Sequence, residues 1–151
     1  MSKSKGFRAE RELVARLWKL GFAVMRAPAS GSKIKKAKYP DVVAIKSGKV
    51  LVLEVKCRSK VESIYIKEDQ INKLREFANR SGGYAFIAIR IPKGVWKLVS
   101  IDSIEKVSNN TYRLSRELII NSKELSEVLK ELKLITTLEE FIAKHDSGSI
   151  S

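Results

Sequence analysis

Two carboxylates and a lysine interrupt apolar runs between residues 39 and 60. Asp41 directly precedes the run VVAI, and Glu54 and Lys56 lie near the end of the next run, VLVLEVK. Asp and Glu offer only oxygen ligands, which are the donors that hard cations such as Mg²⁺ or Mn²⁺ prefer. A metal ion held beside a lysine activates water and neutralises a phosphate, so these residue types indicate phosphodiester hydrolysis.

The two apolar runs are predicted to form a β-hairpin, because they are rich in β-branched residues and Ser47-Gly48 suits a two-residue turn between them. Continued outward from that turn, the register places Asp41 opposite Glu54. Opposed residues have Cβ atoms about 4.5–5.5 Å apart and share one face, which Lys56 also shares. Only a loop of odd length or a bulge would change this register. A cation between the two carboxylates would relieve their repulsion.

A third carboxylate is predicted to face inward from a helix at about residues 7–20, which Gly21 ends. At about 100° per residue, Glu10 falls within the apolar stripe of that helix. The stripe consists of Phe7, Leu13, Val14 and Leu17, and the solvated side carries Arg8, Glu12 and Lys19. Burial of an ionised carboxylate costs on the order of several kcal/mol unless a cation or hydrogen bonds compensate it. Glu10 is therefore expected to meet a compensating partner inside the protein, either a cation or hydrogen-bond donors.

The net charge of +13 is concentrated in the first 60 residues. They contain 16 Lys or Arg against 4 Asp or Glu, whereas residues 61–151 contain 14 against 13. This asymmetry predicts a surface for polyanions, nucleic acid first and an anionic membrane second, and the alternative is a surface that keeps the protein soluble. The hairpin has its own alternative, in which Asp41 caps a strand and Glu54 and Lys56 form an ordinary surface pair. The inward Glu10 and the basic surroundings favour the metal site.

Pro40-Asp41, twelve further residues and Glu54-Val55-Lys56 resemble the PD…(D/E)xK signature of restriction-endonuclease-like nucleases. With AERELVARLWKLGFAVMRAPASGSK upstream and FANRSGGYAFIAIR downstream, the stretch from about Gly6 to Val99 closely resembles the archaeal Holliday junction resolvases. The resemblance implies a restriction-endonuclease-like α/β fold, in which helices flank a mixed β-sheet. It also implies a homodimer that makes paired incisions in four-way DNA junctions and leaves 5′-phosphate and 3′-hydroxyl ends.

The same resemblance implies roles for individual residues. The implied metal ligands are Glu10, Asp41 and Glu54, and the implied metal is Mg²⁺, for which Mn²⁺ could substitute. Lys56 and Ser30 are implied to be catalytic, the serine from a loop near the scissile phosphate. Arg11 and Arg26 are implied to contact DNA.

The segment APASGSKIKKAKY is predicted to be a flexible basic loop next to the metal site, because Pro28 and Gly31 break regular structure. The predicted DNA contacts include its four lysines and other cations of the basic region, namely Lys3, Lys5, Lys33, Lys35, Lys36, Lys38 and Arg58. No base-reading motif appears, so these contacts are expected to tolerate any DNA sequence. The alternative is a lysine-rich connector without a role in binding.

The rest of the domain is predicted to be scaffold, a mixed sheet flanked by helices. The patterns predict strands at 64–66, 84–91 and 95–99, helices at 67–80 and 122–133, and turns at 92–94 and 109–111. Ser122 is the predicted N-cap of the last helix. Exposed apolar residues on the helix at 67–80 could pack a homodimer, and Trp18 and Trp96 are expected in the core or at an interface.

The predicted nuclease domain covers residues 1–133, and residues 134–151 are predicted to be a mobile tail. Within this tail, TTLEEFI resembles the peptides with which replication and repair proteins bind a sliding clamp. Leu138 and Phe141 have the i, i+3 spacing that fills one apolar pocket, with Ile142 beside them. The alternative is a terminal turn that folds back on the protein's own core.

A single Cys57 and a single His145 exclude an internal disulfide and a zinc site. No apolar run approaches the roughly 20 residues that span a bilayer, so a cytoplasmic protein without a membrane partner is expected. The sequence therefore predicts a Mg²⁺-dependent, structure-selective DNA endonuclease that resolves four-way junctions. Two alternatives stay open: a related nuclease with restriction, mismatch or repair specificity, and a non-catalytic basic DNA-binding protein.

Overall fold

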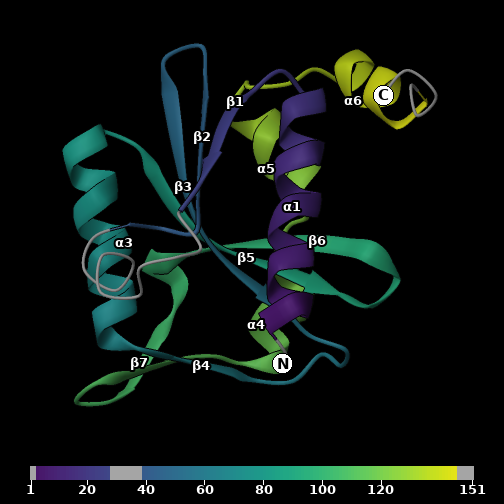
Figure 1. Ribbon diagram of the computed structural model, residues 1–151. Helices are drawn as coiled ribbons and strands as arrows, with labels where there is room; N and C mark the ends of the chain where they lie inside the picture. Colours follow the sequence, from purple (N-terminus) through teal and green to yellow (C-terminus); the bar gives the residue numbers. More distant parts are fainter. Residues whose placement is uncertain (1–2, 28–38, 146–151) are drawn as a thin grey trace.

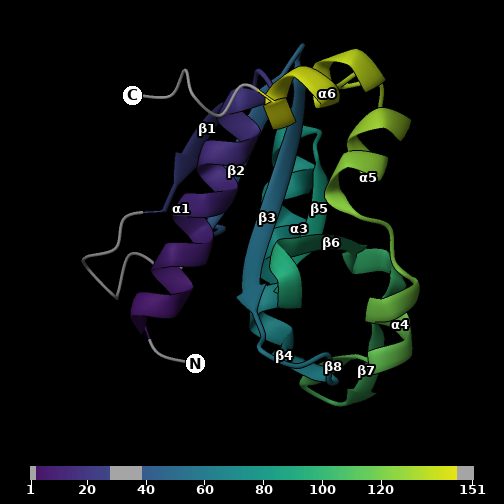
Figure 2. The ribbon, with the colours of Figure 1, turned by 90° about the vertical axis from the view of Figure 1, so that its right-hand side faces the viewer.

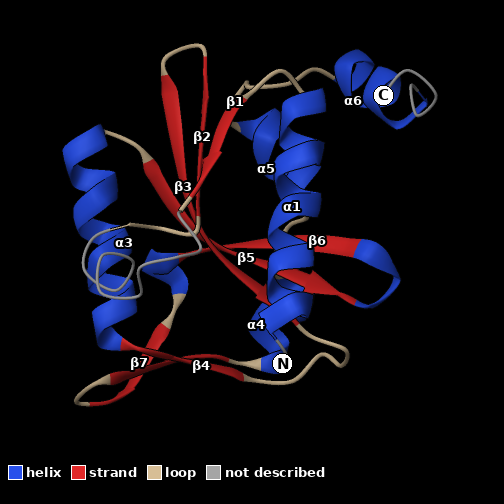
Figure 3. Ribbon diagram, viewed as in Figure 1, coloured by secondary structure: helices blue, strands red, loops and turns tan. Residues whose placement is uncertain are grey.

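The computed structural model describes residues 3–27 and 39–145, without the side chains of residues 3–5. The helices are α1 (Lys3–Lys19), α3 (Glu68–Ser81), α4 (Arg116–Asn121), α5 (Leu125–Glu131) and α6 (Thr137–His145), with short 3-10 helices η1 (Pro92–Gly94) and η2 (Ile101–Ser103). The strands are β1 (Ala23–Arg26), β2 (Val42–Lys46), β3 (Lys49–Cys57), β4 (Ile64–Lys67), β5 (Tyr84–Ile91), β6 (Val95–Ser100), β7 (Glu105–Ser108) and β8 (Thr111–Leu114) (Figure 3). No described helix is long and apolar enough to cross a membrane.

The strands form a five-stranded sheet of order β1-β2-β3-β5-β6 and a three-stranded sheet of order β4-β8-β7. In the larger sheet β3 and β5 run parallel and the other neighbours antiparallel, so the predicted mixed sheet is confirmed. Helix α1 packs on one side of this sheet and α3 on the other (Figures 1 and 2). The predicted class, a mixed sheet flanked by helices, is likewise confirmed.

The turn between β2 and β3 has the geometry that the sequence predicts. Ser47 and Gly48 both have positive φ, 52° and 77°, as a type I′ turn requires. Lys46 pairs with Lys49, and the register continues without a bulge to Val42, which pairs with Leu53. The predicted register is therefore confirmed as far as Val42, and its extension by one residue places Asp41 opposite Glu54.

Strand β3 is buried on both faces, and its side chains alternate between two cores. Leu51, Leu53 and Val55 belong to the first core, which contains Leu13 and Leu17 of α1 and Trp96 of β6. Val52 belongs to the second core, with Ile71 and Leu74 of α3. Because strand residues alternate, Glu54 and Lys56 lie on the α3 face with Val52.

Helix α1 ends in a Schellman motif, which confirms the predicted role of Gly21. Gly21 has φ 92°, its N–H donates to the carbonyl of Trp18 at 3.0 Å, and Phe22 N–H donates to the carbonyl of Leu17 at 3.1 Å. Phe22 and Leu17 are both buried in the first core. The motif turns the chain back along the helix, so that β1 enters the sheet.

The C-terminal third differs from the prediction in two ways. Ser122 is not the N-cap of α5, because it ends the preceding helix α4, which the sequence pattern did not indicate. Glu124 caps α5 instead and is held in extended conformation by a β-bridge to Lys97. Leu134 and Ile135 are buried in the first core, so the folded domain continues past the predicted boundary at residue 133.

The two tryptophans lie in different environments. Trp96 is 1% exposed in the first core, as expected, whereas Trp18 is 65% exposed on α1. The interface that would cover Trp18 stays a prediction.

Candidate active site

Asp41 lies at the start of β2 and is held by both neighbouring strands. Its Oδ2 accepts a hydrogen bond from the backbone N–H of Val55 at 2.9 Å. Its own carbonyl accepts from the N–H of Ala27, just after β1, also at 2.9 Å. These bonds fix the carboxylate beside β3, on the side of Glu54.

Glu54 is only 5% exposed, and its Oε1 has no hydrogen-bond partner among the described residues. Burial, and secondly the charge of Asp41, raise the pKa of Glu54 to about 7, although Lys56 and Lys73 act in the opposite direction. A surface pair of Glu54 and Lys56, the alternative that the sequence left open, does not fit this burial. Burial and the repulsion of Asp41 therefore outweigh, in sum, the attraction of the two lysines, and burial is the larger of these two causes.

Glu10 faces inward from α1, as predicted, with a side chain that is 13% exposed. Its Oε1 lies 3.5 Å from Nε of Arg26, at the end of β1. Its charge is the weakest of the influences that raise the pKa of Glu54. Glu10 therefore stands at the edge of the Asp41–Glu54 pair and faces a cation of the protein itself.

The donor set suits a hard divalent cation. A buried carboxylate oxygen without a partner, opposed to a second carboxylate, leaves negative charge that a metal ion would neutralise, and all donors are oxygens. Among the described residues, however, no three acidic, histidine or cysteine side chains are gathered closely enough to enclose an ion as they stand. Asp41 and Glu54 are thus the residues that could hold a metal, with Glu10 completing the set if it leaves Arg26.

Lys73 of α3 is a site residue that the sequence reasoning missed. Its charge lowers the pKa of Glu54, next in effect after Lys56. The available signal was its position one helical turn before Phe77, which packs at the border of the second core. A lysine at the edge of a buried face often lays its stem over that face and carries its charge toward a neighbouring site.

Glu12 contradicts the prediction that it projects into solvent from α1. Its carboxylate accepts from Arg90 Nε at 3.0 and 2.8 Å and from Trp96 Nε1 at 2.8 Å. The hydrogen bond to Glu12 raises the pKa of Arg90. The helical pattern places Glu12 opposite Glu10, but β5 and β6 reach that side of α1 and supply partners that local spacing does not show.

The structure places some of the predicted DNA contacts and leaves others undescribed. Arg11 is exposed on α1, Arg26 is half-buried on β1, and Arg58 follows β3, where its Nη1 donates to the carbonyl of Cys57 at 3.0 Å. The remaining predicted contacts lie outside the described residues or have undescribed side chains: Lys3, Lys5, Ser30, Lys33, Lys35, Lys36 and Lys38. Their roles stay predictions.

A mixed sheet that presents an Asp, a Glu and a Lys in this spacing defines a nuclease of the restriction-endonuclease-like, PD-(D/E)xK class. The profile of the family described as archaeal Holliday junction resolvase (hjc) matches residues 1–137. The chain belongs to this family.

Similar proteins agree with that assignment. The crossover junction endodeoxyribonuclease Hjc of Sulfurisphaera tokodaii is 39% identical over 143 residues, which cover 93% of this chain and 98% of that protein. The protein of the same name from Sulfolobus acidocaldarius is 38% identical over 143 residues, covering 93% and 99%. The solved structure of Archaeoglobus fulgidus Hjc, a Holliday junction resolvase, superposes with a TM-score of 0.72 at 29% identity, covering 83% of this chain and 96% of that one.

The raised pKa of Glu54 predicts a pH dependence of stability in metal-free protein. At pH 4 the carboxyl is protonated in both the folded and unfolded states, and burial then costs little. As the pH rises from the ordinary value of 4.5 through about 7, the unfolded state loses its proton first, so the free energy of unfolding falls by about 3 kcal/mol. Glu54→Gln lacks this loss and should become more stable than wild type by that amount at pH 8, in urea denaturation with a chelator.

Glu62→Gln is the matched control, because Glu62 is exposed at the surface. Its unfolding free energy should follow that of wild type at every pH. If the unfolding free energies of wild type and Glu54→Gln change with pH in the same way, the fold does not raise the pKa of Glu54, and the prediction is wrong.

Proposed function

We propose that this chain resolves four-way DNA junctions by Mg²⁺-dependent hydrolysis of phosphodiester bonds. The observation that carries the proposal is the pair of opposed carboxylates, half-buried Asp41 and buried Glu54, with Lys56 on the same sheet face. The names of its relatives, crossover junction endodeoxyribonucleases, support the substrate. Mn²⁺ is an expected substitute, since its ligand preferences are similar.

Asp41, Glu54 and Glu10 would hold the metal. Bound there, Mg²⁺ would stabilise negative charge on the phosphate and lower the pKa of a water. The backbone N–H of Val55 orients the carboxylate of Asp41, and Oε1 of Glu54 has no competing hydrogen bond among the described residues. Lys56 keeps a positive charge on the face where charge develops on the phosphate.

Arg26 and the loop before Asp41 supply the proposed phosphate contacts. Arg26 faces Glu10 at 3.5 Å, so a DNA phosphate that attracts its guanidinium would release Glu10 toward the other two carboxylates. Ser30 and the lysines at 33, 35, 36 and 38 are proposed to approach the same backbone. DNA binding would in this way complete the metal site.

Asp41→Asn and Glu54→Gln should each abolish cleavage and leave junction binding nearly unchanged, because phosphate contacts come from the basic surface and not from the carboxylates. The measurement uses end-labelled four-way junction and linear duplex of matched sequence, with Mg²⁺, and Glu62→Gln as the control that cuts like wild type. Mg²⁺ should also raise the thermal midpoint of wild type at pH 8 and not that of Glu54→Gln.

Each other outcome has a defined meaning. Retained turnover in either variant refutes the assignment of the carboxylates. Equal cutting of junction and linear duplex by wild type identifies a related nuclease of another specificity. Tight binding without cleavage in Mg²⁺ or Mn²⁺ identifies a non-catalytic DNA-binding protein.

The proposed homodimer needs an apolar surface, and α3 does not provide it. The prediction that exposed apolar residues of this helix pack a homodimer lacks such residues, because Ile71, Leu74 and Ala78 are buried and Phe77 packs against the second core. Met25 and Ile45, 69% and 42% exposed, lie on β1 and β2. Val43 pairs with Met25, and alternation places this patch on the face that carries Asp41. A dimer packed there would bring two active sites toward each other, as paired incisions require.

Replacement of Met25 and Ile45 by Gln should convert a dimer to a monomer, measured by light scattering of the eluting protein at several concentrations. Ile120→Gln is the control, because Ile120 is also 42% exposed but lies on α4. A mass of one chain for wild type refutes the dimer, and a dimeric double variant places its interface elsewhere.

A second proposed partner is a sliding clamp, bound through α6. The helix contacts the domain through Glu139, which pairs with Lys46, and Glu140, which pairs with Lys130 at 2.9 Å. The side chains of Leu138, Phe141 and Ile142 are 66%, 57% and 53% exposed, although Ile142 lines a pocket together with Glu139 and Lys46. The helix therefore folds back on the domain, and the three apolar side chains stay largely exposed, as docking to a clamp would require.

Calorimetric titration should show that a clamp binds wild type and not a Leu138→Ala, Phe141→Ala double variant, since both side chains fill one pocket in this mode of docking. The two proteins should cut junctions at the same rate. Equal binding of both proteins, or of neither, refutes the proposed clamp contact.

A further inference from the structure

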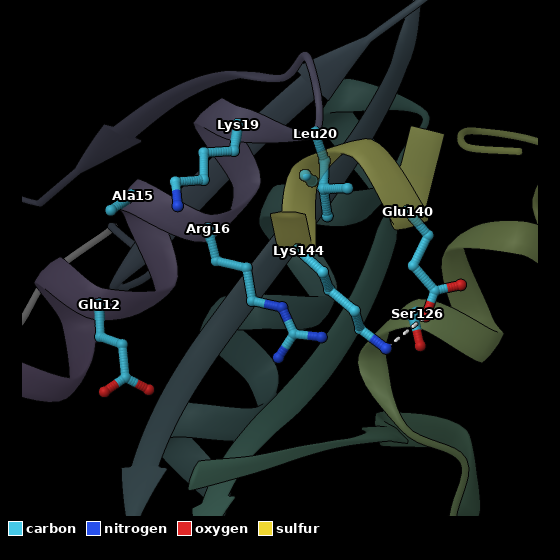
Figure 4. Close-up of a pocket in the computed structure, with 9 residues that line it drawn as sticks. Glu12, Ala15, Arg16, Lys19, Leu20, Ser126, Glu140 and Lys144 are labelled. Carbon is cyan, nitrogen blue, oxygen red and sulfur yellow. Dashed lines mark ion pairs between the residues drawn. The ribbon is translucent and has the colours of Figure 1, made fainter. Parts of the chain in front are cut away.

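A cavity of about 480 Å³ lies between the second half of α1, the start of α5 and α6. Its apolar wall consists of Ala15, Leu20 and Ala143. Its polar lining consists of Glu12, Arg16, Lys19, Ser126, Glu140 and Lys144 (Figure 4). Glu10 and Arg16 are six residues apart on α1, so their side chains point about 120° apart around the helix axis, and this cavity lies on a different side of α1 from the proposed metal site.

Both acids of the cavity are already neutralised by the protein. Glu12 accepts from Arg90 at 3.0 and 2.8 Å. Glu140 pairs with Lys130 at 2.9 Å and Lys144 at 3.3 Å, and the hydrogen bond from Lys130 is the main cause that lowers the pKa of Glu140. Two cations thus share the single charge of Glu140.

Arg16 is left without a counter-charge among the described residues. Its usual helical partner would be Glu12, four positions earlier, but Glu12 is bound to β5 and β6. Figure 4 shows that the guanidinium of Arg16 extends from α1 across the cavity, toward the ammonium of Lys144 and toward Ser126. Ser126 is 8% exposed, and its hydroxyl makes no hydrogen bond with a described residue.

We propose that this cavity binds a phosphate group. The planar fork of Arg16 suits two phosphate oxygens, Lys144 adds charge, and the hydroxyl of Ser126 donates to a third oxygen. A volume of about 480 Å³ with an apolar wall has room for the organic part of a phosphate ester. The phosphate comes either from a nucleotide-sized ligand or from the backbone of a junction arm that passes this side of α1.

Two probes, inorganic phosphate and thymidine 5′-monophosphate, test the site by amide NMR shifts at constant ionic strength. We expect saturable shifts at residues 125–127 and 140–144, with affinity reduced about tenfold in Arg16→Gln and less in Ser126→Ala. Arg116→Gln is the matched control, because Arg116 is exposed on α4, away from the cavity, and should bind both probes like wild type.

Junction binding distinguishes the two sources of phosphate. If DNA supplies the group, Arg16→Gln weakens junction binding and reduces the slope of log affinity against log salt by about one, whereas Arg116→Gln does not. If a free ligand supplies it, junction binding is unchanged and only probe binding is lost. Two NMR results contradict the proposal when junction binding is also unchanged in Arg16→Gln. In the first, the amide shifts spread over the whole basic surface; in the second, they are equal in wild type and Arg16→Gln. Thermal melts confirm that each variant is folded.

Discussion

The register of the β2–β3 hairpin is the constraint on which the candidate site depends. Ser47 and Gly48 both adopt positive φ, and this turn fixes Lys46 opposite Lys49 and therefore Asp41 opposite Glu54. A slip by one residue would move Glu54 to the face of the first core, away from Asp41. The burial of β3 on both faces opposes such a slip, because every apolar side chain of the strand would change sides as well. Packing of the scaffold and placement of the carboxylates thus have one cause.

The same register is expected to lower the free energy of unfolding of the metal-free protein. Glu54 is held near Asp41 in a buried position, and its raised pKa measures how strongly the fold disfavours its charge. Lys56 and Lys73 reduce this cost without forming a hydrogen bond to Oε1 of Glu54, which keeps that oxygen open. A site arranged in this way is destabilised when empty of cations and gains stability when it binds one. Structural ion pairs elsewhere, such as Glu12 with Arg90, show the opposite arrangement, with each oxygen satisfied.

The sequence predicted the parts of the fold that local rules determine. The turn at Ser47-Gly48, the end of α1 at Gly21 and the inward position of Glu10 follow from backbone geometry and helical periodicity, and the structure confirms each. Glu12, Ser122 and Lys73 were misjudged or missed, because their partners are distant in the chain. The partners of Glu12 are Arg90 and Trp96, which follow it by 78 and 84 residues. Glu124 rather than Ser122 caps α5, since a bridge to β6 sets where that helix begins. Spacing within one element cannot show such contacts.

The same limit applies to the charge asymmetry. Lys46 and Lys49 belong to the basic first 60 residues, yet both hold the C-terminal segment: Lys46 pairs with Glu139, and Lys49 donates to the carbonyl of Leu132 at 2.7 Å. Lys46 also donates to the carbonyl of Leu20, just after α1, at 2.7 Å. The excess charge is therefore not all available to DNA. Part of it joins the two halves of the chain, because Lys46 pairs with Glu139 and Lys49 donates to a backbone carbonyl of the second half. Where that pairing is incomplete, as at Arg16, a cation remains available for an anion from outside the protein.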